Sequence, residues 1–147
     1  KSYAPAIAGA ESCGWEHLVL SAGWGTCQRS VRSGDWLYTR TYHDGYNCFP
    51  DQQLYHVVRD PHQVENLCDS SSQIVNELDR ILEEWKHEMV SRMPYPGTRD
   101  PMDVVLEEGG PLRGNSLGTL IDNLLASGRD HDAQMMRDRY ESEIREP

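Results

Sequence analysis

The chain has 147 residues, of which 24 are acidic and 14 basic, so it carries a formal net charge of -10. This charge disfavours nucleic acids and anionic membrane surfaces as partners, because both select for Lys and Arg. No run approaches the roughly 20 apolar residues that a membrane-spanning helix needs. A domain of this size can bury a hydrophobic core without disulfide bonds to stabilise it.

The four cysteines, Cys13, Cys27, Cys48 and Cys68, are widely separated in the sequence. No Cys-x-x-Cys pair is present, so neither a zinc knuckle nor a redox dithiol is indicated. Separate thiols are the expected state, and two disulfides remain the alternative for a secreted protein.

An alternating pattern of β-branched and aromatic residues covers positions 16–58 and is typical of strands linked by hairpins. It predicts four strands, at Glu16 to Ala22, Cys27 to Arg32, Trp36 to Tyr42 and Gln53 to Val58. A tight turn is expected at Gly34, since glycine tolerates the positive φ of such loops. In the third strand, Trp36, Tyr38, Arg40 and Tyr42 share one side, which we expect to pack, while the Thr-rich side is wetter.

From Asp69 the apolar period changes to that of a helix. The predicted apolar stripe consists of Ile74, Leu78, Ile81, Leu82, Trp85 and Met89. A hydroxyl of Ser70, Ser71 or Ser72 is expected to cap the start of this helix, and Pro94 to end it. The stripe requires a surface to cover, and the sheet provides one.

The remainder is rich in Gly and Pro up to Gly118, with a short helical turn predicted at 102–107. Ser116 is expected to cap a helix that ends at Gly128. Residues 130–144 have a thin apolar stripe, which fits a docked helix, a frayed tail or half of an interface. The predicted fold is therefore α+β. A four-stranded antiparallel sheet and a long helix occupy residues 1–93, and a Gly/Pro-rich segment and helical tail occupy 94–147.

Six side chains are candidates for a substrate-facing site: Trp24, Arg29, Arg32, His43, Asp44 and Tyr46. Arginine can hold a sulfate or carboxylate with two hydrogen bonds, and aromatic rings can stack on a sugar or aryl group. In the alternative, the arginines pair with acidic side chains and the aromatic rings pack in the core. Metal-ligand residue types are scattered without the spacing of a zinc or calcium site, so no metal site is predicted.

Two segments carry a resemblance to a known family. Residues 29–38 read Arg-Ser-Val-Arg-Ser-Gly-Asp-Trp-Leu-Tyr, and residues 54–67 read Leu-Tyr-His-Val-Val-Arg-Asp-Pro-His-Gln-Val-Glu-Asn-Leu. Together they resemble the C-terminal region of type I sulfatases in the alkaline phosphatase superfamily. His56 stands where that family usually has Asp, and Gln63 where it usually has Glu. The resemblance implies a small antiparallel sheet followed by a long helix.

The resemblance also implies what the chain lacks. The sulfatase nucleophile occurs in a Cys-x-Pro-x-Arg motif, whereas Cys48-Phe49-Pro50 is followed by Asp51 and Gln52. Without that arginine, no neighbouring cation helps to neutralise a sulfate, so a nucleophilic role for Cys48 is disfavoured. The family implies calcium or another divalent cation, but in the preceding catalytic domain and not in this chain.

The leading hypothesis is a C-terminal subdomain of a sulfatase-like sulfuric ester hydrolase that lacks a full catalytic site. Its partners would be the N-terminal sulfatase catalytic domain and, in the parent enzyme, a sulfate ester. The loop near His43 would supply a substrate contact. The alternative is a free-standing, non-catalytic binding or assembly module.

Overall fold

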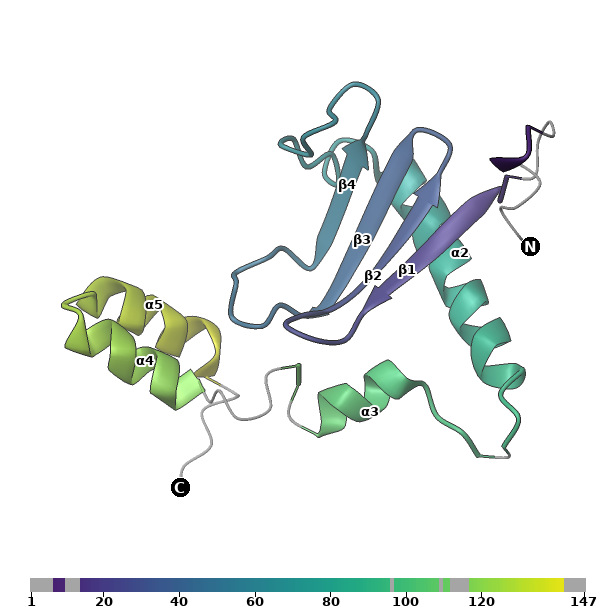
Figure 1. Cartoon of the computed structure of the whole chain (residues 1–147). Helices are drawn as coiled ribbons and strands as arrows, with labels where there is room; N and C mark the ends of the chain where they lie inside the picture. Colours follow the sequence, from purple (N-terminus) through teal and green to yellow (C-terminus); the bar gives the residue numbers. More distant parts are fainter. Residues whose placement is uncertain (1–6, 10–13, 96, 109, 112–116, 142–147) are drawn as a thin grey trace.

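A computed structural model describes residues 7–9, 14–95, 97–108, 110–111 and 117–141. Within these residues, the strands are β1 (His17–Ala22), β2 (Cys27–Ser33), β3 (Trp36–His43) and β4 (Gln52–His56). The helices are α2 (Ser72–Ser91), α3 (Pro101–Glu107), α4 (Leu117–Ala126) and α5 (Asp130–Arg139). The predicted α+β class is confirmed: Figure 1 shows the sheet with α2 across one face.

The four strands form one antiparallel sheet in the order β1-β2-β3-β4, so each strand pairs with the next in sequence. Ser33 pairs with Trp36 across a two-residue turn, in which Gly34 has a φ of 52°. The register places Tyr38 opposite Val31 on one side and Leu54 on the other. These three residues lie on the same face, because directly opposed residues in antiparallel strands point the same way.

Helix α2 packs on that face and forms the main core of the molecule. The fully or largely buried members of this core are Val31, Tyr38, Leu54, Val75, Leu78 and Leu82. Three positions of the predicted stripe, Ile74, Ile81 and Trp85, are partly buried around it, while Met89 is 42% exposed. The aromatic side of β3 therefore packs as predicted.

Two local predictions need correction. Ser71 is the N-cap residue of α2, but its hydroxyl makes no capping hydrogen bond. The hydroxyl of Ser70 instead donates to the carbonyl of Leu67, so it is directed back toward the preceding turn. The fourth strand ends at His56, because residues 57–59 form a turn in which the amides of Arg59 and Asp60 donate to the His56 carbonyl.

The outer edge of β4 is covered by its own following loop. The Asn66 side chain accepts from the Leu54 amide at 3.0 Å and donates to the Gln52 carbonyl at 3.0 Å. The Leu67 amide then donates to the Leu54 carbonyl. Upstream in this loop, the Asp60 carboxylate accepts hydrogen bonds from the backbone N–H groups of Val64 and Glu65.

Helices α4 and α5 form a second, smaller core. Its buried residues are Leu117, Ile121, Leu124, Ala133, Met136 and Tyr140, and Tyr46 and Cys48 from the β3–β4 loop pack against them. Of the three interpretations of the last amphipathic segment, the structure shows a docked helix. It ends at Arg139, and the predicted positions Ser116 and Ile144 lie outside the described residues.

Candidate functional site

The structure separates Trp24, Arg29 and Arg32 from one another and brings the other three candidate site residues together at the end of β3. Arg29 is buried under α2, whereas Arg32 lies near the opposite end of β2 at the turn into β3. The Arg32 guanidinium donates hydrogen bonds to the carbonyls of Gly34 and Trp36, and these bonds hold that turn. The Trp24 side chain, in the loop between β1 and β2, is 89% exposed.

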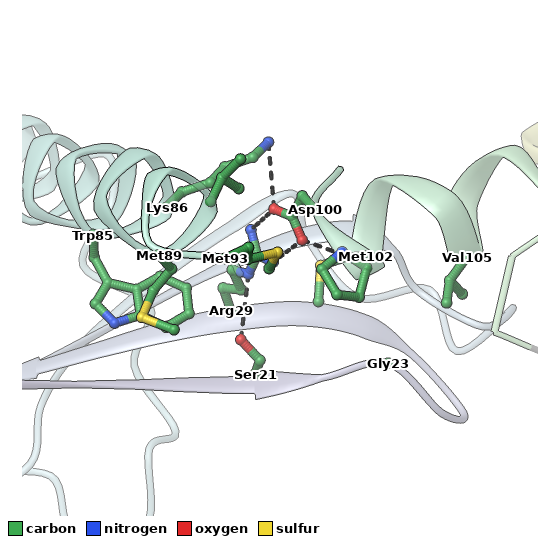
Figure 2. Close-up of a pocket in the computed structure, with 12 residues that line it drawn as sticks. Ser21, Gly23, Arg29, Trp85, Lys86, Met89, Met93, Asp100, Met102 and Val105 are labelled. Carbon is green, nitrogen blue, oxygen red and sulfur yellow. Dashed lines mark hydrogen bonds and ion pairs between the residues drawn. The ribbon is translucent and has the colours of Figure 1, made fainter. Parts of the chain in front are cut away.

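Arg29 forms a buried, two-pronged ion pair with Asp100. The two guanidinium nitrogens lie 2.6 and 2.5 Å from the two carboxylate oxygens, and the side chains are only 6% and 3% exposed. Asp100 is also the N-cap of α3, where it accepts from the Met102 amide at 3.0 Å. Figure 2 shows this pair among the residues that line a pocket, with Ser21 accepting a further hydrogen bond from Arg29.

The charges around this pair favour the ionised carboxylate. Burial alone would raise the pKa of Asp100, but the hydrogen bonds from Arg29 and from the Met102 amide outweigh burial and lower the pKa. Lys86 on α2 lies 3.8 Å from Asp100 and 3.3 Å from Asp103 on α3. The pair therefore anchors α3 against β2 and α2 and is not free to bind an incoming anion.

The space beside the ion pair, which we call the Arg29 pocket, has a volume of about 320 Å³. Its apolar walls come from α2, from the residues just after it and from α3, and consist of Trp85, Met89, Val90, Met93, Met102 and Val105. Ser21 and Gly23 at the end of β1 close one side. The Arg29 guanidinium lies 5.5 Å from the centre of the Trp85 ring. This cation–π contact helps to hold Trp85 in the apolar wall of the pocket.

His43, the last residue of β3, lies together with Asp44 and Tyr46 in the loop that follows. The Asp44 carboxylate is 7% exposed and accepts from the Tyr140 hydroxyl at 2.5 Å and from the Tyr46 amide at 3.0 Å. Arg139 lies 3.7 Å from Asp44 and donates to the Phe49 carbonyl. The end of α5 therefore holds this loop through one acidic side chain.

The same loop lines a polar pocket of about 330 Å³, here called the His43 pocket. Its lining is Thr41, Tyr42, His43, Asp44, Phe49, Asp51, Arg139 and Tyr140. The ring of Tyr46 contacts both His43 and Tyr140 in edge-on geometry, with centroids 5.5 and 5.0 Å apart. Burial and the hydrogen bond to Asp44 raise the pKa of the Tyr140 hydroxyl, which therefore stays a hydrogen-bond donor at neutral pH.

Two glycines allow close packing around this pocket. Gly45 has a φ of 61°, and a side chain there would collide with the carbonyl of Gly25 in the β1–β2 loop. Gly110 has a φ of 85°, and a Cβ at that position would come within 2.8 Å of the His43 ring. Gly110, which follows α3, thus lies directly against the His43 ring.

Sequence reasoning did not assign Asp100, Arg139 or Tyr140 to a site. Asp100-Pro101 carries a local signal for a helix start, since Asp is a favoured N-cap and Pro a favoured first residue. Neither signal identifies Arg29 as the partner, which lies 71 positions earlier. The thin stripe of α5 likewise does not reveal that Tyr140 reaches Asp44.

In the described part of the chain, no group of three or more His, Cys, Asp or Glu side chains converges as a metal site would require. Cys27, Cys48 and Cys68 are free thiols, and Cys13 lies outside the described residues. No helix among the described residues is long and apolar enough to cross a membrane. Cys48 packs beside α5, with its sulfur 4.0 Å from the Tyr140 hydroxyl.

No protein-family model and no curated protein matches the chain. Among solved structures, a Bacteroides thetaiotaomicron sulfatase, described with the metabolism of glycosaminoglycans, aligns at 20% identity and a TM-score of 0.44, over 57% of this chain and 19% of its own. The YidJ protein of Bacteroides fragilis, described as a candidate sulfatase, aligns at 17% identity and a TM-score of 0.43, over 57% of this chain and 18% of its own. This chain is thus similar to part of two sulfatase structures and spans about a fifth of their length.

Proposed function

We propose that this chain is the C-terminal subdomain of a sulfatase-like sulfuric ester hydrolase, in which it completes the fold and shapes the substrate cleft. The observation that carries the proposal is where the two segments that resemble sulfatases lie in the fold. Residues 29–38 form the β2–β3 hairpin, and residues 54–67 form β4 with the loop that covers its edge. Both segments therefore belong to one sheet and to the loop on its edge, which supports a role in completing the fold.

The His43 pocket supports a substrate contact in the parent enzyme. It combines a histidine and an arginine with carboxylate and hydroxyl groups on one concave surface. Arg139 is 43% exposed, so its guanidinium is accessible to a sulfate or hydroxyl group of a substrate while it supports the loop. In this proposal His43, Asp44 and Tyr46 shape the cleft, and Arg29 and Arg32 maintain the sheet.

Absence of a nucleophile in this chain is part of the proposal. Cys48 has no arginine at position 52, and its packing against α5 places it in a small core. Catalysis would then come from the N-terminal catalytic domain, which would also hold the divalent cation. The partner of this chain would be that domain, and the substrate of the assembled enzyme a sulfate ester.

The test compares this chain alone with the same chain joined to whatever polypeptide its gene encodes upstream. A chromogenic aryl sulfate is the substrate, with calcium present. The expected result is no sulfate release by the isolated chain, with native circular dichroism, and turnover by the longer protein. In the longer protein, Arg139→Gln should raise KM more than it lowers kcat.

Two outcomes would contradict the proposal. Turnover by the isolated chain that disappears in Cys48→Ala would show that this chain is itself a minimal enzyme. A gene without an upstream catalytic segment, together with a stable isolated chain, would instead favour the free-standing binding or assembly module.

A further inference from the structure

The Arg29 pocket has no role in the proposed function, yet it has the characteristics of a ligand site. Its walls are apolar and come from elements far apart in the sequence, and Figure 2 shows the methionine and tryptophan side chains gathered around the ion pair. Methionine side chains are flexible and polarizable, so such walls adapt to ligands of varied shape. The bidentate pair between Arg29 and Asp100 holds the base of the pocket in one geometry.

The charges at the pocket balance one another. Arg29 is paired with Asp100, and Lys86 is paired with Asp103 and lies near Asp100. The two cations therefore face two anions, and each has a partner within the protein. A charged ligand would have to break one of these pairs and leave a partner uncompensated, which is costly for the buried pair. An uncharged ligand requires no such exchange.

The volume sets the size of the ligand. A cavity of about 150 Å³ lined by apolar side chains is large enough for benzene, and the Arg29 pocket is about 320 Å³. A molecule of roughly two fused or linked rings therefore fits. Trp85 offers an aromatic face to such a molecule, and Met89, at 42% exposed, lies toward solvent where the ligand would enter.

We propose that the pocket between α2, α3 and the end of β1 binds a small uncharged aromatic ligand of about two rings. This activity is independent of the sulfatase proposal, since it uses neither the His43 pocket nor a catalytic domain. The ligand contacts the apolar walls, and the ion pair beneath it stays intact.

Two fluorescent probes with the same ring skeleton test the charge argument. 2-Naphthol is a two-ring molecule that is neutral at pH 7, whereas 2-naphthol-6-sulfonate carries an additional sulfonate. The expected result is saturable binding of the neutral probe at one site, with an affinity at least about tenfold higher than that of the sulfonate. Equal or tighter binding of the sulfonate would overturn the proposal, as would no binding of the neutral probe.

A filling variant tests the location. Val105→Trp adds an indole inside the pocket and should weaken binding of 2-naphthol at least about tenfold. Val58→Trp is the matched control, because Val58 is 65% exposed and lies outside the pocket lining. Unchanged binding in a folded Val105→Trp variant would place the probe elsewhere and refute the assignment.

A third variant keeps the test valid if Val105→Trp does not fold. Asp103→Asn removes one partner of Lys86, which lines the pocket, and Asp103 itself is 40% exposed, so the local charge becomes more positive without an unpaired buried group. It should improve binding of the sulfonate probe and leave the neutral probe unchanged. An equal effect on both probes would show that charge does not select the ligand.

Discussion

The ion pair between Arg29 and Asp100 gives the most direct test of how the second half of the chain is held to the sheet. Asp100→Asn removes the negative charge but keeps nearly the same volume and a side-chain oxygen able to cap α3. Removing one partner of a buried pair costs about 3–5 kcal/mol, because the other charge is left uncompensated. At about 2–4 °C per kcal/mol for a chain of this size, the lower bound corresponds to a decrease in Tm of roughly 6–12 °C.

The matched control is Asp103→Asn, the same substitution three positions further along α3. Asp103 has a side chain that is 40% exposed and pairs with Lys86 at 3.3 Å, so its loss should cost at most about 1 kcal/mol. Urea denaturation followed by circular dichroism measures both changes, and amide exchange at Glu108, whose N–H donates to the Val104 carbonyl, reports on α3. Equal changes in unfolding free energy for the two variants would refute the view that burial makes the Asp100 pair strong.

The difference in unfolding free energy between the wild-type chain and Asp100→Asn should depend on pH in one direction. Because the pKa of Asp100 is lowered on folding, its contribution is present above the ordinary carboxyl value of 3.8 and is lost as the pH falls through the lower folded value. The gap in stability between the wild-type chain and Asp100→Asn should therefore narrow in acid and remain constant near neutrality.

Three further predictions concern other parts of the molecule. Tyr140→Phe leaves the buried Asp44 without its hydroxyl partner, so about 1–3 kcal/mol should be lost, with faster amide exchange in α5. Gly45→Ala should cost about 1–3 kcal/mol more than Gly34→Ala by thermal unfolding, because both glycines have positive φ but only Gly45 faces a backbone carbonyl. Burial and the hydrogen bond to Asp79 raise the pKa of Tyr38, so stability should fall as the pH rises above its ordinary value of 10.0, and Tyr38→Phe should flatten that decline.

The fold was largely predictable because its determinants are local. Each strand pairs with its neighbour in sequence, so the alternating pattern and the turn at Gly34 were sufficient to give the sheet and its order. The helical period likewise gave α2 and its buried side. The cap of α2 was not predictable, since the direction of a serine hydroxyl depends on backbone angles at the helix start that the sequence pattern does not specify.

The candidate sites were less predictable because they are built from distant contacts. Arg29 appeared as a potential anion-binding residue until Asp100 was found beside it. His43, Asp44 and Tyr46 are adjacent in sequence, so their proximity followed from the loop itself. Arg139 and Tyr140, which complete that pocket, come from a helix whose weak apolar stripe was compatible with several arrangements.

The long-range polar contacts also bear on the order in which the chain folds. The sheet consists of successive hairpins, and such local pairings close short loops at low entropic cost. The contacts of Arg29 with Asp100 and of Asp44 with Tyr140 span 71 and 96 positions, so each requires a long loop to close. Strands and α2 should therefore assemble first, and α3, α4 and α5 should dock on a finished sheet. During synthesis on the ribosome, the sheet and α2 would be complete before the residues that anchor the C-terminal helices emerge.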